Sequence, residues 1–322
     1  MSKILTFAAC IGAFSWGNVL AWTAPALPHI AGCLNDCDFK YTADQGSWIA
    51  SLATLGCMAG CFANGFIMDT LGRKWTITVM AVPLIIGWVL MLMPHLTGNN
   101  EDIAIWIFYV GRSVLGKFNL DYVKIIERII SVIILGFASG AYILVSSIYI
   151  SECSEQTIRG TLGNLMPLMV NLGVLFVNGV SAFVHWTVMT GLCLIFPAII
   201  LVAMPFMPES PVFLMLRLRE ADAKKSLERL RGPNHNVQDE INQISKALAE
   251  KQAVGSVGIK DMMTRRKYLI PTIMSLMLMT IMQASGLNAI IFYLGDIFLK
   301  ADTNMSPALQ ATLVSLCTVM LF

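Results

Sequence analysis

Two amide side chains, Gln283 and Asn288, lie within a long apolar stretch of the sequence, where they could hydrogen-bond a polar ligand inside a membrane. An amide left without a partner in hydrocarbon costs on the order of several kcal/mol, so such residues are rare there unless they have a task. In a straight helix, five residues place two side chains about 140° apart around the axis. Both amides can therefore face one ligand only if the helix unwinds between them, which Ser285 and Gly286 would permit. The alternative is that they hydrogen-bond neighbouring helices.

A second group of residues could form an ionic latch at a membrane edge: Gly65, Asp69, Gly72, Arg73 and Lys74. The glycines allow a tight turn, and a carboxylate at Asp69 favours a helix amino terminus or an arginine as its partner. Arg73 and Lys74 would stay in the aqueous phase. The alternative is an ordinary basic flank that stops transfer across the membrane.

The elements that must hold these residues are membrane helices, because the composition is far from that of a soluble protein. The chain is 56% hydrophobic and 13% charged, and its mean hydropathy is +0.69. A soluble domain carries about twice that share of charged residues. The net charge of +2 gives no indication of nucleic-acid binding. We therefore expect an all-α, polytopic membrane protein, without a cleavable signal peptide because the first apolar run, from Ile4 to His29, is too long for one.

Stretches of about 20 apolar residues predict the individual spans. They are residues 5–29, 46–68, 75–95, 129–150, 161–184, 187–206 and 268–294, and an eighth span begins near Pro307. Residues 209–267 hold more than half of the 22 lysine and arginine residues. Together with Arg73, Lys74 and Arg159 they fall on one side of the membrane, so the positive-inside rule places the amino terminus in the cytoplasm.

The long basic segment, residues 208–267, is predicted to be a cytoplasmic linker of short amphipathic helices. The helical stretches run from 211 to 218, from 220 to 230 and from 237 to 249. Apolar residues recur at the three- and four-residue spacing of a surface helix, as in Ile241, Ile244 and Leu248. An ordinary linker between domains is the alternative.

Five short motifs occur in an order, and at positions relative to the spans, that resemble one family. They are the stretch Gly65 to Lys74, the pair Gly111-Arg112, Tyr149 to Glu152 followed by Arg159-Gly160, Pro208 to Pro211, and the stretch around Gln283 and Asn288. Each motif is short, but the set resembles the major facilitator superfamily and, within it, the sugar porter family. Residues 45–48 and 288–293 look most like those of insect facilitated trehalose transporters.

The resemblance implies a fold of two six-helix bundles that rock around a site at the middle of the membrane. Residues 1–207 would form the first bundle, 208–267 the linker, and 268–322 an incomplete second bundle, because the chain ends after the start of the eighth span. The resemblance also implies transport of a sugar, trehalose or a hexose, across the plasma membrane, with the lipid bilayer as the other partner. It implies no enzyme activity, cofactor, metal or nucleic acid, and it leaves the oligomeric state open.

Residues are assigned by the resemblance to two tasks. Sugar hydroxyls would be bound by Gln283, Asn288 and Asn171. A cytoplasmic gate network, closed by charges, would comprise Asp69, Arg73, Lys74, Arg112, Glu152, Arg159 and Glu209. A solvated pair in a loop is the alternative for Glu152 and Arg159.

Residues 117–136 interrupt the resemblance. In the family, the Gly-Arg pair runs straight into a glycine-rich stretch of the same helix, whereas here this segment separates Arg112 from Phe137. Its residues are mostly types with AT-rich codons, and its ends can be encoded by sequences that resemble splice sites. We interpret it as a translated in-frame intron, and a true loop insertion is the alternative. If it is retained, residues 129–150 are still long enough to span, whereas residues 103–116 are too short and would leave Arg112 outside its network.

The sequence leaves further questions open. Because spans beyond the eighth are absent from the 322 residues, we expect no transport by this chain alone. A truncated regulatory or non-functional transporter-like protein and a seven-span chemoreceptor are the alternative functions. Pro167 and Met282 replace glutamines that are usual in the family, so the identity of the sugar is open. Two modifications are also left open: a disulfide between Cys33 and Cys37, and glycosylation of Asn304.

Overall fold

A computed structural model of the chain describes residues 2–30, 43–96, 120–155, 157–232, 237–254, 265–300 and 306–320. Within these ranges the regular structure is helical and includes no β-strand. The prediction of an all-α fold is therefore confirmed. Five residues named in the sequence analysis lie outside the described residues: Cys33, Cys37, Gly111, Arg112 and Asn304.

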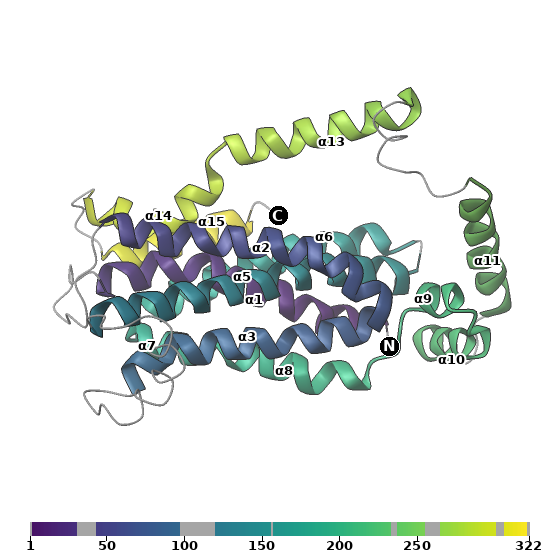
Figure 1. Ribbon diagram of the computed structural model, residues 1–322, viewed down its shortest axis with the longest axis horizontal. Coiled ribbons are helices and arrows are strands. Elements are labelled where there is room, and N and C mark those ends of the chain that lie inside the picture. The colour runs from purple at the N-terminus through teal and green to yellow at the C-terminus, as the bar shows by residue number, and fades with distance from the viewer. Residues whose placement is uncertain are drawn as a thin grey trace.

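The first part of the chain forms a bundle of long helices that lie side by side (Figure 1). They are α1 (Ser2–Ile30), α2 (Ala43–Leu71), α3 (Arg73–Leu96), α5 (Leu120–Cys153), α6 (Arg159–Ser181), and the pair α7 (Trp186–Cys193) and α8 (Ile195–Ala203). Six described stretches are long and apolar enough to cross a membrane: Ser47–Leu71, Arg73–Leu92, Arg128–Cys153, Arg159–Ser181, Trp186–Phe206 and Arg266–Leu294. They match the predicted second to seventh spans, and α1 matches the first.

Helix α5 includes much of the 117–136 segment. It begins at Leu120 and continues without a break into the fourth span, which runs from Arg128 to Cys153. A helix long and apolar enough to span is therefore present with the segment retained. Arg128 is 1% exposed, and its guanidinium lies 5.1 Å from the centre of the Trp186 ring, so a residue of the segment packs in the core of the bundle.

Close backbone contact holds α2 against α5, and glycine makes it possible. A Cβ atom on Gly60 would lie 2.0 Å from the carbonyl oxygen of Phe137, where no side chain fits. Large aromatic side chains fill the rest of the core, among them Trp22, whose Nε1 donates to Thr190 Oγ1 at 2.8 Å. Because hydrocarbon outside the bundle is as apolar as the core, such close packing is a main source of helix association in membranes.

The predicted short helices of the basic segment are present. The turn η1 (Met204–Phe206) ends the sixth span, and α9 (Pro211–Leu216), α10 (Glu220–Arg231) and α11 (Val237–Val254) follow at one end of the bundle (Figure 1). Leu227, Val237 and Ile241 form a small apolar core of their own. We call this end of the bundle the linker end and the other the far end.

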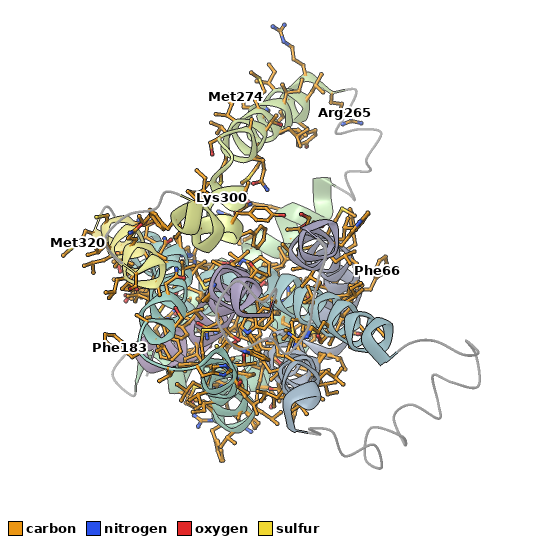
Figure 2. All side chains as sticks on the ribbon, turned by 90° about the vertical axis from the view of Figure 1, so that its left-hand side faces the viewer. Phe66, Phe183, Arg265, Met274, Lys300 and Met320 are labelled. Atoms are coloured by element: carbon orange, nitrogen blue, oxygen red, sulfur yellow. The ribbon has the colours of Figure 1, made fainter. Side chains whose placement is uncertain are left out.

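The last helices pack unequally on the bundle. α13 (Arg266–Ala284) has no buried residue and stands apart from the other helices, as the position of the labelled Met274 in Figure 2 makes visible. α14 (Leu287–Lys300) packs against α1, and α15 (Pro307–Met320) packs against α6. The contact between these helices and the first bundle is therefore concentrated toward the far end.

Candidate functional site

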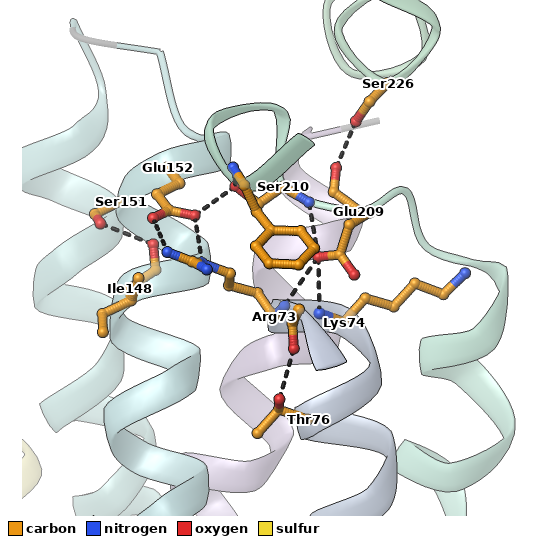
Figure 3. Close-up of polar contacts among 11 residues, drawn as sticks. Arg73, Lys74, Thr76, Ile148, Ser151, Glu152, Glu209, Ser210 and Ser226 are labelled. Atoms are coloured by element: carbon orange, nitrogen blue, oxygen red, sulfur yellow. Dashed lines mark hydrogen bonds and ion pairs between the residues drawn. The ribbon is translucent and has the colours of Figure 1, made fainter. Parts of the chain in front are cut away.

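A buried ion pair joins α3 to α5 at the linker end (Figure 3). Arg73 Nε donates to Glu152 Oε2 at 2.9 Å, and Arg73 Nη2 donates to Glu152 Oε1 at 3.0 Å. The two side chains are 7% and 14% exposed. Ser210 Oγ also donates to Glu152 Oε2. Parallel bonds of this kind fix the geometry of an arginine–carboxylate pair as well as strengthening it.

Glu209 caps the amino terminus of α3. Its Oε1 accepts the backbone N–H groups of Arg73 and Lys74, each at 3.0 Å, and that of Ser210 at 2.9 Å. The first N–H groups of a helix lack partners within the helix, and this end carries the positive pole of its dipole. Gly72 makes the approach possible, because its φ is +88° and a Cβ there would lie 2.7 Å from Glu209 Oε2. We call Arg73, Glu152, Glu209 and Ser210 the latch.

An aromatic ring covers the latch. The guanidinium groups of Arg73 and Arg217 lie 5.1 and 5.6 Å from the centre of the Phe213 ring, which is 9% exposed. Ser226 Oγ donates to the backbone oxygen of Glu209 at 2.6 Å and ties α10 to the same place. The ring covers part of the ion pair, and reduced contact with water strengthens its electrostatic attraction.

Three arginines of the basic segment bind carbonyl groups where earlier helices end. Arg217 Nη2 donates to Asp69 O at 2.5 Å near the end of α2, and Arg229 Nη2 donates to Phe206 O at 2.8 Å at the end of η1. Arg231 Nη1 donates to Cys153 O, the last residue of α5, at 2.8 Å. Carbonyls at a helix end lack partners within the helix and carry the negative pole of its dipole. We call Arg217, Arg229 and Arg231 the helix-end arginines.

The structure brings together part of the predicted gate network. Arg73, Glu152 and Glu209 meet in the latch, and Lys74 joins through its backbone N–H, with its Nζ 5.4 Å from the centre of the Trp75 ring. Asp69 and Arg159 are exposed. Their side chains show no hydrogen bond or ion pair within the part of the chain that the structure describes, and Arg112 lies outside it.

Ser210 lies within the Pro208 to Pro211 motif, but sequence reasoning assigned no role to it, nor to Phe213, Ser226 or the helix-end arginines. A local signal exists for Ser210, because a serine directly before a proline is typical of a helix start. Its Oγ indeed accepts the N–H of Phe213 at 3.2 Å, as a helix cap does. The contacts of Arg217 and Ser226 are to distant backbone oxygens, which carry no sequence signature.

The pH dependence of stability tests the burial of Glu209. Burial raises the pKa of this carboxyl above its ordinary value, although backbone N–H groups and Arg73 oppose the shift. The folded state then binds a proton more tightly than the unfolded state, so stability falls as pH rises through the raised pKa. We expect the free energy of unfolding to show this loss in the parent protein and not in Glu209→Gln, measured by denaturation in detergent across that range.

The matched control for this measurement is Glu228→Gln, which replaces an exposed carboxylate on α10. It should keep the pH dependence of the parent protein. Equal pH profiles for the parent protein and Glu209→Gln would contradict the prediction.

The two amides of the seventh span meet at a break in the helix. α13 ends at Ala284, α14 begins at Leu287, and Gly286 between them has a φ of +73°, a value that favours glycine. Asn288 Nδ2 donates to Gln283 Oε1 at 2.9 Å. The helix is therefore broken where the sequence would permit it, and the break lets the two amides contact each other, with Gln283 exposed on α13.

Asn171, the third predicted sugar contact, lies on α6. Its Nδ2 donates to the carbonyl oxygen of Pro167 at 3.1 Å, one turn earlier in the helix. The side chain is half-buried. Its one described hydrogen bond leaves the amide oxygen and one N–H proton for other partners.

Comparison with known proteins gives a family match over nearly the whole chain. The chain matches the family described as "Sugar (and other) transporter" over residues 5–119 and 120–322. The boundary between the two matched parts falls inside the 117–136 segment.

The facilitated trehalose transporter Tret1 of Polypedilum vanderplanki is 29% identical over 316 residues, which are 98% of this chain and 56% of the relative. Tret1 of Drosophila erecta is 31% identical over 297 residues, which are 92% of this chain and 31% of the relative. The chain thus spans about half the length, or less, of these relatives.

Solved structures show the same arrangement of helices. The partially occluded inward-open conformation of the xylose transporter XylE from E. coli matches with a TM-score of 0.75 at 20% identity, covering 99% of this chain and 69% of that one. The major facilitator superfamily proton:xylose symporter XylE bound to 6-bromo-6-deoxy-D-glucose also matches with a TM-score of 0.75 at 20% identity. It covers 99% of this chain and 68% of that one.

Proposed function

From the premise that this chain belongs to the sugar (and other) transporter family and is a multi-pass membrane protein with the major facilitator fold, we propose that it serves facilitated sugar transport across the plasma membrane. The predicted family and fold are confirmed by these matches. The family is one of transporters rather than enzymes. The proposed substrate is trehalose or a hexose, which two helix bundles expose to either side in turn.

The amide pair at the helix break carries this proposal. Gln283 and Asn288 present both donors and acceptors, which suit sugar hydroxyls because each hydroxyl can donate and accept. Without a ligand they satisfy one another across Gly286 at 2.9 Å. A sugar can replace this contact without leaving an amide unpaired in the membrane. Asn171 on α6 is proposed as a further contact.

The names of the relatives support the class of substrate. The curated relatives described above are trehalose transporters, and XylE is a xylose transporter with a sugar derivative bound in one structure. The proposed mechanism needs neither a cofactor nor a metal, because no covalent bond of the sugar changes. Recognition rests on hydrogen bonds, and movement rests on changes in helix packing.

The proposed orientation places the linker end in the cytoplasm. Figure 1 shows the amino terminus and α9 to α11 at the same end of the bundle. More than half of the lysine and arginine residues of the chain lie in residues 209–267. The positive-inside rule then makes this end cytoplasmic, and the latch becomes a cytoplasmic gate element.

Sugar binding tests the proposal directly, and binding suits a chain that spans about half the length of its relatives. We expect the purified protein in detergent to bind labelled trehalose or glucose saturably. Gln283→Ala and Asn288→Ala should each weaken binding by up to about tenfold, since one hydrogen bond contributes about 0.5–1.5 kcal/mol. Equilibrium scintillation proximity measurements give the dissociation constants.

Thr280→Ala is the matched control for these variants. Thr280 is exposed on α13 one turn before Gln283, and its Oγ1 donates to Leu276 O at 2.8 Å. The control should bind sugar as the parent protein does. If neither sugar binds saturably, or if the Gln283→Ala, Asn288→Ala double variant binds like the parent protein, the proposal is wrong.

A further inference from the structure

Three asparagines follow one face of α6. Asn164, Asn171 and Asn178 are spaced seven residues apart, which brings them back to nearly the same side of a helix, with a drift of about 20° per step. Asn164 is exposed, Asn171 is half-buried and Asn178 is 1% exposed. This polar face therefore becomes progressively more buried from the linker end toward the far end.

The helix that buries Asn178 is α15. Asn178 Nδ2 donates to Ser315 Oγ at 2.9 Å, and both residues are buried. One residue further along α6, a Cβ on Gly179 would lie 3.7 Å from Thr312 of the same helix α15. Asn178 and Ser315 come from opposite sides of the basic segment, so their hydrogen bond links the first bundle to the helices that follow it.

Other contacts close the far end at the same level. Thr23 Oγ1 of α1 donates to the carbonyl oxygen of Phe292 in α14 at 3.4 Å. Ala24, Leu294 and Ala311 form a small apolar cluster, which joins α1, α14 and α15. By contrast, α13 turns away toward the linker end and buries no residue (Figure 1). The helices on the two sides of the basic segment thus meet at the far end and separate at the linker end.

The contact between Asn178 and Ser315 leaves the other polar atom of the Asn178 amide unsatisfied. Asn178 Oδ1 is buried and has no hydrogen-bond partner among the described residues. A buried acceptor without a donor is destabilising. Separation of α15 from α6 therefore costs little free energy, because it breaks one hydrogen bond but lets the unsatisfied oxygen of Asn178 find a donor in water.

We propose that the hydrogen bond between Asn178 and Ser315 is an outer gate, which holds the far end of the sugar path closed while the linker end is open. This inference rests on the proposed function, because the space between the helices is a sugar path only if the protein carries sugar. Asn178 is a positioning residue in this role, because it sets the separation of two helices. When the gate opens, its amide becomes exposed on the same polar face as Asn171.

Cross-linking tests whether the closed end exists in the membrane. Asn178→Cys and Ser315→Cys are combined with Cys317→Ala, and a protease site is inserted between α10 and α11. A one-carbon bis-methanethiosulfonate reagent should join the two cysteines, so that the fragments stay together after cleavage until a reductant is added. The control pair of Asn164→Cys with Ser315→Cys should not be joined, because Asn164 lies about 21 Å from Asn178 along α6. Failure of the first pair, or equal joining of the control pair, would overturn the proposal.

Accessibility tests whether the hydrogen bond holds the end closed. In intact cells, an impermeant maleimide reports on Thr312→Cys, and mass spectrometry of its peptide measures the extent of labelling. Ser315→Ala removes the hydrogen bond and leaves the buried amide of Asn178 unpaired, so it should raise the labelling rate by about fivefold, the equivalent of one hydrogen bond of about 1 kcal/mol, whereas Asn164→Ala should leave it unchanged. An unchanged rate in Ser315→Ala would overturn the proposal.

Neither measurement uses a sugar. A failure of sugar binding at Gln283 and Asn288 would therefore contradict the proposed function and leave the results of the cross-linking and labelling measurements unchanged. Failure of the gate measurements would likewise leave the binding result intact.

Discussion

The Glu152→Ala variant is expected to lose about 3–5 kcal/mol of stability, because it leaves the charge of Arg73 buried without its partner. The Arg73 side chain is 7% exposed, and both of its bonds to Glu152 would vanish together. In detergent, denaturation followed by intrinsic fluorescence or by a thiol-reactive dye measures this loss. Loss of the ion pair also frees α3 from α5 at the linker end, so the latch should open.

A double variant separates the ion pair from the packing around it. Replacing both charges with apolar residues of similar size, Arg73→Met with Glu152→Leu, should recover much of the stability, because no lone charge remains. The single variants Arg73→Met and Glu152→Leu complete the cycle, and the coupling between these two substitutions then measures the interaction of the pair. Arg159→Ala is the matched control, since Arg159 is exposed and makes no ion pair within the described residues, and it should change stability by less than about 0.5 kcal/mol. A loss in Glu152→Ala as small as that of the control would contradict the prediction.

Gly60→Ala is expected to destabilise the protein by about 3 kcal/mol or more, at the upper end of the range for overpacked cores. The new Cβ would lie 2.0 Å from the carbonyl oxygen and 2.8 Å from the carbonyl carbon of Phe137. Both are backbone atoms of α5, so no side-chain rotation can relieve the clash and the two helices must separate. Thermal denaturation of the purified protein, together with the yield of folded protein, measures the effect.

Gly65→Ala on the same helix is the matched control. A Cβ at Gly65 would have no atom within 4 Å, and alanine favours a helix over glycine by up to about 1 kcal/mol. The control should therefore be neutral or stabilising. Comparable losses in the two variants would show that the effect comes from glycine in a membrane helix in general rather than from the contact between α2 and α5.

The long elements of this chain could be predicted because each depends on local properties of the sequence. A run of apolar residues is enough to predict a span, and α2, α3 and α6 lie close to their predicted ranges, as does the spanning part of α5 from Arg128 to Cys153. The break in the seventh span was predictable for the same reason. Ser285 and Gly286 separate two apolar stretches, and Gly286 adopts a φ that favours glycine.

The latch was predictable only in part, because it depends on how helices face one another. Asp69 and Arg73 are close in sequence, yet Arg73 is buried beside Glu152 while Asp69 is exposed. Glu209 binds backbone N–H groups in place of a charged side chain. A partner of this kind is invisible to any pairing of charges in a sequence, since every residue except proline offers the same group.

The helix-end arginines have a consequence for the order in which the protein is made. Arg217, Arg229 and Arg231 bind the ends of helices that precede them in the chain, and Glu209 likewise caps the earlier helix α3. Arg231 also pairs with Glu240 of α11, which still precedes α13. All of these partners have left the ribosome before α13, which begins at Arg266. At about 5–20 residues per second, translation gives the first bundle about 2–7 s to close its latch before the next membrane helix begins to appear. The first half can therefore be a finished folding unit when the ribosome delivers the second.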